Sequence, residues 1–332
     1  MKKILVMPVK NEDWILETSL ACASLWADHI IVADQNSTDR SRQIYKKFSK
    51  VRMIENSAKF HSSNVRKMLL DEARKFEGNN VIFSFDADEI PTSEILRPEF
   101  WTKVESLPVG SSVEMLWVNL WRSVKQYRSD GVQAPAWKHI GFIDDRKTEY
   151  TNLNVINDHT SRVPLLFARN SYRFEDPKIL HYQFANWDRT QSKQVHYRMT
   201  EWLQKDKTWL NALKINLKYF PSKDERDLVL KNVPDKWMAG YELKGVEIKN
   251  LRIIPWSWHN EEIFGYFYNY GVNFFKLLDI WDVDWKTQQK NFFSTMSGSD
   301  IYDPRGVFGR FYQAHLAGLY SIYRCYRYFK NK

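Results

Sequence analysis

Two aspartates one residue apart, Asp86 and Asp88, follow an apolar segment at residues 80–85 that has the composition of a buried strand. In an extended backbone, side chains at positions i and i+2 point to the same side, so both carboxylates would face one ligand. Two like charges this close raise each other's pKa unless a cation neutralises them. Mg²⁺ and Mn²⁺ prefer carboxylate oxygens and leave positions for phosphate oxygens. The pair therefore predicts a metal site for phosphate chemistry, with a solvated turn as the alternative interpretation.

A third carboxylate, Asp34, ends another apolar segment at residues 29–33. In dinucleotide-binding folds, an acid after the second strand accepts hydrogen bonds from a ribose or a base, and an ordinary strand-end turn is the alternative interpretation of Asp34. Residues 8–12 contain no glycine, so the glycine-rich phosphate fingerprint is absent. Phosphate charge would then be met by a metal and by basic side chains.

The elements that must position these acids alternate along residues 1–90. Strands are predicted at residues 4–7, 29–33, 51–54 and 80–85, and helices at residues 13–25 (capped by Asp13), 40–48 and 62–76. This alternation predicts an α/β fold with an open, mostly parallel sheet covered by helices on both faces. Ligands bind such sheets beyond the carboxyl ends of the strands, where all three aspartates lie.

After about residue 110 the pattern changes. Strand-like segments are predicted at residues 112–117, 137–142, 163–167 and 179–184, and helices at residues 190–204, 209–217, 261–278 and 307–328. We predict a catalytic domain at residues 1–185, with a nucleotide half (1–95) and an acceptor half (96–185). An aromatic-rich helical extension is predicted at residues 186–332.

Composition excludes several classes of protein. The chain of 332 residues carries 49 Lys and Arg against 40 Asp and Glu, and it is 43% hydrophobic, which excludes intrinsic disorder. Two cysteines, Cys22 and Cys325, are too few for a disulfide framework. The apolar run near the N-terminus is too short for a signal peptide, and no segment is long enough to span a membrane. A cytoplasmic location is therefore expected.

The order and spacing of four motifs resemble family 2 glycosyltransferases with the GT-A fold. These motifs are PVKNE at residues 8–12, WADHIIVAD at 26–34, NSTD at 36–39 and DADE at 86–89. The resemblance covers about residues 3–95. It implies transfer of a sugar, with inversion, from a nucleoside diphosphate sugar (a UDP-sugar by preference), with Mn²⁺ or Mg²⁺ as cofactor.

The resemblance also implies the residues of the site. Those implied to bind the nucleotide sugar are Pro8, Val9, Asn11, Glu12, Asp34, Asn36, Arg66, Asp86, Ala87 and Lys193. The implied metal ligands are Asp88, Asp86 and His181. The segment around His181 and the later Lys193 resemble lipopolysaccharide-core members of the family, whereas a histidine in an apolar run is otherwise a hydrogen-bonded core residue.

Two positions depart from the family's pattern. Gln35-Asn36 stands where many relatives have a glycine, and residues 60–66 replace a Gly-x-x-x-Ala-Arg-Asn motif, which leaves the register of Arg66 open. Asn tolerates left-handed turns, so the first departure is mild.

The base that deprotonates the acceptor must come from the second half of the catalytic domain. Three carboxylates qualify: Asp158, Glu175 and Asp176, of which Asp176 is preferred because Glu175-Asp176 resembles the family's Glu-Asp pair.

Two interpretations compete for the aromatic C-terminal part. Residues 256–293 are expected to pack on the core of the catalytic domain or on a second subunit. Residues 307–330 combine aromatics at helical spacing with cations, which favours a peripheral membrane helix at the inner face of the membrane over packing.

The expected partners are a nucleotide-sugar donor and a saccharide or lipid-linked acceptor in cell-surface polysaccharide or glycolipid assembly, with a homo-oligomer as a further candidate. Nucleic acid is not expected, because no basic run or recognition motif occurs. The alternative functions are a nucleotidyl- or phosphotransferase that uses the same carboxylates, and a non-catalytic nucleotide-binding scaffold.

Overall fold

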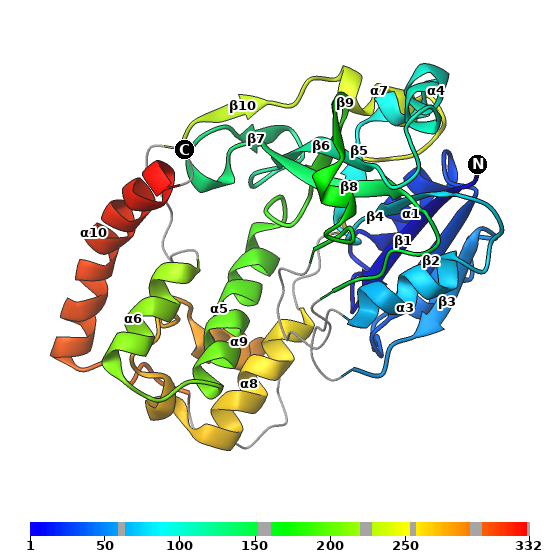
Figure 1. The fold of residues 1–332 in the computed structure, drawn as a ribbon. Coiled ribbons are helices and arrows are strands. Elements are labelled where there is room, and N and C mark those ends of the chain that lie inside the picture. Colours follow the sequence, from blue (N-terminus) through cyan, green and yellow to red (C-terminus); the bar gives the residue numbers. More distant parts are fainter. Residues whose placement is uncertain (59–63, 152–160, 220–227, 253–256, 293–300, 331–332) are drawn as a thin grey trace. The chain divides into compact units, whose positions relative to one another are not determined.

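The computed structural model describes residues 1–58, 64–151, 161–219, 228–252, 257–292 and 301–330 (Figure 1). They form two compact units. Unit 1 comprises Met1–Ser129, Gln133–Ala185 and Leu230–Ile253, and unit 2 comprises Asp130–Val132, Asn186–Val229 and Ile254–Lys332. Residues 230–253, which were expected in the helical extension, thus belong to unit 1, because β10 (Leu230–Asn232) pairs with β7 (Gln126–Arg128).

Unit 1 is built on a mixed, mostly parallel sheet of eight strands in the order β3-β2-β1-β4-β8-β6-β9-β5. These are β1 (Lys3–Val9), β2 (His29–Asp34), β3 (Val51–Glu55), β4 (Val81–Ser84), β5 (Glu89–Pro91), β6 (Ser112–Asn119), β8 (Ala136–Ile143) and β9 (Ser171–His181). Strands β1 to β4 run parallel, β8 is antiparallel to both β4 and β6, and β9 runs parallel to β6. The α/β class predicted from the sequence is confirmed.

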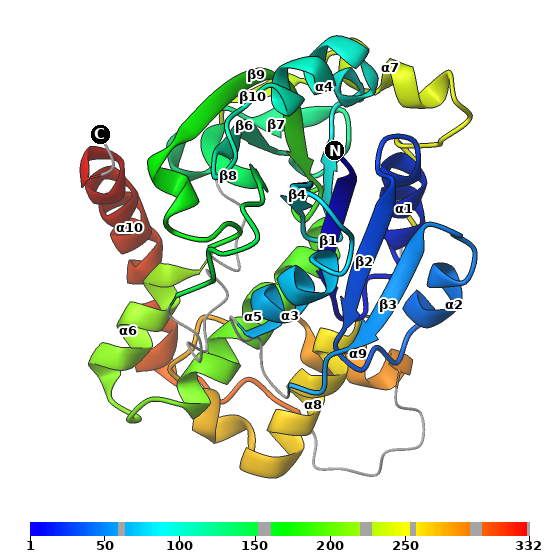
Figure 2. The ribbon, with the colours of Figure 1, turned by 45° about the vertical axis from the view of Figure 1, so that its right-hand side comes forward.

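Five α-helices accompany this sheet: α1 (Leu16–Ser24), α2 (Ser41–Tyr45), α3 (Asn64–Ala73), α4 (Pro98–Glu105) and α7 (Lys236–Glu242). Alternate residues of β1 are buried on opposite faces of the sheet. Ile4 and Val6 share a core cluster with Leu69 of α3. Leu5 and Met7 are equally buried on the other face, and Figure 2 shows α1 on the side of the sheet opposite α3. Burial on both faces explains why these strands are uniformly apolar.

Three predicted elements differ in the structure. Helix α1 begins at Leu16 without a side-chain cap, because the carboxylate of Asp13 instead binds Arg40 and Arg252 at 3.2 and 2.6 Å. Residues 163–167 form turns that lead into η3 (Phe167–Arg169), and β9 starts only at Ser171. The helix expected at residues 261–278 is interrupted at Gly271, whose φ of 74° ends α8.

Unit 2 is helical. Its elements are α5 (Trp187–Leu203), α6 (Trp209–Lys218), α8 (Trp258–Tyr270), η4 (Val272–Phe275), α9 (Trp285–Phe292) and α10 (Val307–Lys330). Aromatic side chains from α5, α8 and the following loop form its core, among them Trp202, Phe267 and Trp281. Packing therefore accounts for much of the aromatic content of residues 256–292. No helix in the described parts of the chain is both long and apolar enough to cross a membrane.

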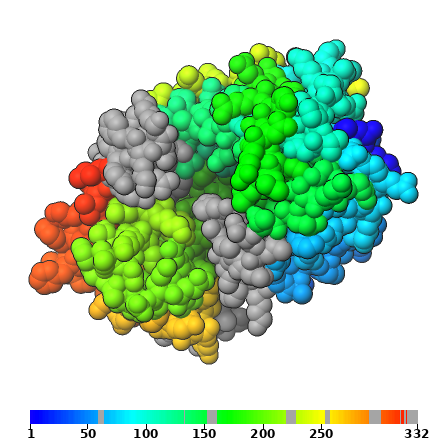
Figure 3. Space-filling model, viewed as in Figure 1, coloured from blue at the N-terminus to red at the C-terminus, as the bar shows by residue number. Residues whose placement is uncertain are grey.

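Helix α10 lies against α6 in unit 2 (Figures 1 and 3). Its two faces differ in exposure. On one face Leu316 and Tyr320 are buried, and the Tyr320 hydroxyl binds Asp279 at 3.0 Å. On the other face Phe308 and Ile322 are exposed by 90% and 68%. The helix thus keeps an apolar surface that its own unit does not cover.

Candidate active site

Asp34 ends β2 and is fully buried. Its Oδ1 accepts hydrogen bonds from the Ser37 amide at 3.0 Å and from Arg42 Nε at 2.9 Å. Its Oδ2 accepts one from the Tyr45 hydroxyl at 3.0 Å, and burial together with this carboxylate raises the pKa of Tyr45. The acid expected to bind nucleotide therefore also organises the loop after β2 and the helix that follows.

Asn11 and Asn36 occupy the turns at this edge of the sheet. Both adopt left-handed backbone conformations, with φ of 53° and 50°, as expected where many relatives carry a glycine after the second strand. The Asn11 Oδ1 accepts from the Thr38 amide at 2.7 Å, which ties the loop after β1 to the loop after β2. Val9 pairs with Asp34, so Pro8 and Val9 lie at the same edge.

Asp86 follows β4 and is held by two arginines. Its Oδ1 accepts a hydrogen bond from Arg66 Nη2 at 3.0 Å, and its Oδ2 accepts one from Arg162 Nη2 at 2.7 Å. Arg66 lies in the first turn of α3 and also donates to the Ser84 hydroxyl at 2.7 Å. The structure thus brings Arg66 and Asp86 together, as the predicted site requires, and adds Arg162.

Glu89 is a buried acid of this site for which the sequence suggested no role. Its Oε1 accepts from Arg162 at 2.6 Å and from Trp117 Nε1 at 2.9 Å, and its Oε2 accepts from the Asp86 amide at 3.0 Å. Burial raises the pKa of Glu89 to about 7. The positive charge of Arg162 lowers this pKa, whereas the negative charges of Asp86 and Asp88 raise it. Glu89 therefore fixes the turn that carries both aspartates.

Arg162 bridges Asp86 and Glu89 across more than 70 residues of sequence. Burial lowers its pKa, but the carboxylates of Glu89 and Asp86 outweigh this effect and raise it. Its guanidinium lies 5.9 Å from the Trp117 ring, and Lys138 lies 5.3 Å from the same ring. Burial and the charge of Arg162 lower the pKa of Lys138. No sequence motif marks these residues, because strand pairing brings them to the site.

Asp88 and His181 meet because β5 pairs with the end of β9, where Glu89 lies opposite His181. The His181 Nε2 lies 3.7 Å from the Asp88 Oδ2, and both residues are buried. Two donors on one octahedral ion with bonds of 2.0–2.1 Å lie roughly 3 Å apart when adjacent and about 4 Å apart when opposite. The 3.7 Å between Asp88 and His181 lies between these two values, so both side chains can bind one divalent cation after a shift of less than about 1 Å.

The metal ligands predicted from the sequence thus divide into two groups. Asp88 and His181 face each other, whereas both oxygens of Asp86 are engaged by Arg66 and Arg162. Within the described residues, no three His, Cys, Asp or Glu side chains are arranged as a ready metal site. A cation between Asp88 and His181 would need further ligands, which donor phosphates can supply.

Asp176, the preferred acceptor base, lies apart from Asp88 and His181 in the sheet. Thr92, just beyond β5, exchanges hydrogen bonds with Lys178, whereas Glu89 at the other end of β5 faces His181. Asp176 precedes Lys178 and so lies towards the Thr92 end, about 16 Å of extended chain from His181. Its carboxylate accepts from Lys178 Nζ at 2.6 Å. Glu175 lies beside it, in an irregular stretch of β9 between the residues that pair with Met115 and Trp117.

Three other predicted residues, Glu12, Ala87 and Lys193, have different surroundings. Glu12 Oε2 accepts from Trp14 Nε1 at 2.6 Å, and Ala87 is buried. Lys193 lies on α5 in unit 2, with its ammonium 5.8 Å from the Tyr197 ring. Asp158 lies outside the described residues.

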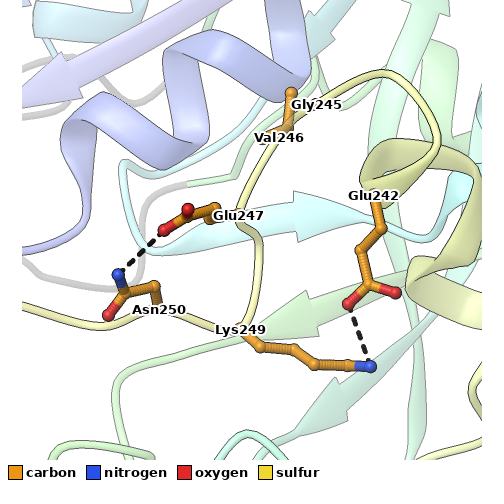
Figure 4. Close-up of a pocket in the computed structure, with 6 residues that line it drawn as sticks. All are labelled: Glu242, Gly245, Val246, Glu247, Lys249 and Asn250. Atoms are coloured by element: carbon orange, nitrogen blue, oxygen red, sulfur yellow. Dashed lines mark hydrogen bonds and ion pairs between the residues drawn. The ribbon is translucent and has the colours of Figure 1, made fainter.

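Unit 1 also has an open hollow beside α7, lined by Glu242, Gly245, Val246, Glu247, Lys249 and Asn250 (Figure 4). Lys249 is paired with Glu242 at 2.9 Å, and Asn250 donates to Glu247 at 3.0 Å. The hollow contains none of the predicted site residues, and its lysine is already neutralised. The candidate active site therefore remains the group of carboxylates after β4.

Residues 4–113 match the protein family described as Glycosyl transferase family 2. This stretch contains β1 to β4 and both aspartates after β4, and it confirms a family 2 domain where the sequence motifs placed one. The match covers about a third of the chain. No curated protein matches the sequence.

Several solved structures resemble this chain at low identity. A fragment of TarS from S. aureus, residues 1–349, is 14% identical over 65% of this chain and 70% of its own, with a TM-score of 0.37. Glucosyl-3-phosphoglycerate synthase from Mycobacterium tuberculosis, in complex with Mn²⁺, UDP and glucosyl-3-phosphoglycerate, is 16% identical over 36% of this chain and 44% of its own, with a TM-score of 0.25. A 4-diphosphocytidyl-2C-methyl-D-erythritol synthase is 12% identical over 53% and 89%, with a TM-score of 0.34.

Proposed function

We propose that this chain, through the family 2 glycosyltransferase domain at residues 4–113, is a metal-dependent inverting glycosyltransferase that uses a nucleoside diphosphate sugar, with UDP as the favoured nucleotide. The observation that carries the proposal is the group of charges after β4. Three acids, Asp86, Asp88 and Glu89, lie there with two arginines, Arg66 and Arg162. The positive charge of a divalent cation and the negative charge of a diphosphate would nearly cancel when both bind to this group.

The two arginines are suited to hold the donor's diphosphate. Arg66 is buried in α3, and Asp86 orients its guanidinium and that of Arg162 from opposite sides. Planar guanidinium groups match phosphate oxygens in pairs, which favours them over single ammonium groups. When bound by Asp88 and His181, Mn²⁺ or Mg²⁺ would act as a Lewis acid that stabilises charge on the departing diphosphate.

The reaction itself is a single displacement. The acceptor hydroxyl oxygen attacks the anomeric carbon from the face opposite the diphosphate, and the bond from that carbon to the phosphate oxygen breaks with its electron pair. A carboxylate takes the hydroxyl proton, and the nucleoside diphosphate leaves against Arg66 and Arg162. The base stays a prediction among Asp158, Glu175 and Asp176. Asp176 pairs with Lys178 at the Thr92 end of β5, the end away from His181.

Product analysis tests the proposal. The protein is incubated with UDP-glucose or UDP-N-acetylglucosamine and Mn²⁺, and the nucleotide is identified by chromatography. Release of UDP supports cleavage at the anomeric carbon. Release of UMP, or formation of UTP with added pyrophosphate, would assign the carboxylates to phosphoryl or nucleotidyl transfer instead, and binding without turnover would indicate a scaffold.

The acceptor class that we favour is a cell-surface polysaccharide or glycolipid, of the lipopolysaccharide-core or capsule type, reached at the inner face of a membrane. The support lies in unit 2, where α10 carries no Asp or Glu and four Arg or Lys. Phe308, Phe311 and Ile322 are exposed on it. Trp209 at the start of α6 is also exposed, and its ring lies 6.2 Å from that of Tyr312 on α10. Exposed aromatics with flanking cations suit an anionic lipid surface.

Vesicle sedimentation tests this part of the proposal. Wild-type protein should sediment with vesicles that contain phosphatidylglycerol and less with neutral vesicles, and the double variant Phe308→Ser, Phe311→Ser should lose most of this binding. Tyr268→Ser is the matched control, because Tyr268 is 75% exposed on α8, away from this surface in sequence. Equal sedimentation of both variants would contradict membrane binding through α10.

A further inference from the structure

Asn119, the last residue of β6, is a buried amide that contacts His181 directly. In the register of the two parallel strands Asn119 lies opposite His181, and its Oδ1 is 2.8 Å from the His181 Nδ1. Asn119 is 1% exposed and His181 is 6% exposed. A hydrogen bond at this depth is costly to leave unmade, so it constrains both side chains.

The orientation of the Asn119 amide is fixed by Gln133. The Asn119 Nδ2 donates to the backbone carbonyl of Gln133 at 3.0 Å and to its side-chain Oε1 at 3.0 Å. A backbone carbonyl can only accept, so the nitrogen of the amide must face Gln133 and its oxygen must face His181.

This orientation sets the tautomer of the histidine. Because the Asn119 Oδ1 can only accept, the His181 Nδ1 must carry the proton that it donates. In the neutral ring the other nitrogen, Nε2, then bears a lone pair, and it lies 3.7 Å from the Asp88 Oδ2. Two electron-pair donors that face each other at this distance are stabilised by a cation between them.

The ring plane is restrained as well. The Trp117 ring stacks on His181 with centroids 4.2 Å apart and an interplanar angle of 26°. The Trp117 Nε1 in turn donates to Glu89, which lies beside Asp88 in the sequence. His181 is therefore held by a hydrogen bond at its Nδ1 edge and by an aromatic face.

We propose that Asn119, anchored by Gln133, is a positioning residue that holds His181 as its Nδ1–H tautomer, so that Nε2 can bind a divalent cation shared with Asp88. The inference rests on the proposed metal-dependent function and adds to it the residues that prepare the ligand. Outer hydrogen bonds of this kind orient ligating histidines, and their loss typically costs about 10- to 100-fold in metal affinity.

Two substitutions of Asn119 test the inference. Asn119→Leu keeps a similar size and removes the acceptor, whereas Asn119→Asp keeps an acceptor for the Nδ1 proton. Ser112→Ala is the matched control, because Ser112 is buried on the same strand and its hydroxyl contacts a different histidine, His139, at 3.1 Å. Thermal unfolding of each variant confirms that it is folded.

Two readouts apply to the full-length protein without donor or acceptor. Long-range ¹H–¹⁵N NMR reports the tautomer of His181, assigned with His181→Gln, and titration with Mn²⁺ alone reports the affinity for the metal. We expect the Nδ1–H tautomer in the wild-type protein. Asn119→Leu should shift the ring towards Nε2–H and weaken Mn²⁺ binding by about 10- to 100-fold. Asn119→Asp should keep the Nδ1–H tautomer, and Ser112→Ala should stay close to wild type in both readouts.

The outcomes separate this inference from the proposed function. If Asp88→Asn abolishes Mn²⁺ binding while Asn119→Leu changes neither tautomer nor affinity, the role of Asn119 is overturned and the metal site stands. If the wild-type protein binds no Mn²⁺, the inference is overturned, and UDP release without metal then decides whether sugar transfer survives. A folded Asn119→Leu that loses affinity without a change of tautomer would also overturn it.

Discussion

Two strand ends of the same sheet carry acids but use them differently. At the end of β2, Asp34 is satisfied by its own surroundings, through Arg42, Tyr45 and the Ser37 amide. At the end of β4, Asp88 instead faces His181 across 3.7 Å. Both carboxylates are buried, so burial alone does not distinguish them.

The difference lies in whether the partners of each acid donate hydrogen bonds to its carboxylate. The partners of Asp34 are all donors, so the group is electrostatically complete without a ligand. The partner of Asp88 is a histidine whose proton is directed away from it, towards Asn119. We infer that the β2 end organises the nucleotide edge of the sheet, whereas the β4 end supplies the chemistry.

Substitution at the β2 end should therefore have its main effect on stability. We expect Asp34→Asn to lower the free energy of unfolding by about 3 kcal/mol, because charge-assisted hydrogen bonds from Arg42 and Tyr45 are weakened and the remaining group is buried. Urea unfolding measures this change. Glu55→Gln is the control: its pair with Arg42 is exposed on both sides, so less than about 1 kcal/mol is expected. Equal losses in the two variants would contradict the assigned role of Asp34.

The pH dependence of stability sharpens the comparison at the β4 end, with an effect of similar size. Because burial raises the pKa of Glu89 to about 7, the folded state holds its proton more tightly than the unfolded state does. Stability from this group is full below the unfolded pKa of about 4.5 and is lost as the pH rises towards 7. We expect Glu89→Gln to remove about 3 kcal/mol of this decline. Chemical unfolding of both proteins between pH 4.5 and 8 measures it, and parallel profiles would contradict the shifted pKa.

The sequence predicted the part of the site that depends on local order. Strands β1 to β4 read as short apolar runs, and each ends in a turn whose polar residues mark the ligand-binding edge. The left-handed Asn36 was also predictable, since asparagine tolerates the conformation for which relatives use glycine. Asp34, Asp86 and Asp88 could be named for this reason, whereas Arg66 was named only through the resemblance to the family.

The rest of the site depends on pairings that no local pattern encodes. Arg162 reaches Asp86 and Glu89 from a turn before β9, and Trp117 and Asn119 reach His181 because β6 and β9 are neighbours. The same pairing separates Asp176 from the site, since β9 places His181 and Asp176 towards opposite ends of β5. A Glu-Asp pair close in sequence to a histidine was therefore a poor guide to distance from it.

The most direct test of the central claim is the rate of UDP release from a UDP-sugar with Mn²⁺, measured for the wild-type protein and for Asp88→Asn with Asp34→Asn as the reference. If the β4 end supplies the chemistry, Asp88→Asn should lose on the order of 10²–10³ in rate while it unfolds like the wild type. Asp34→Asn should keep most of its rate per folded molecule. A folded Asp88→Asn that releases UDP at the wild-type rate would contradict the account.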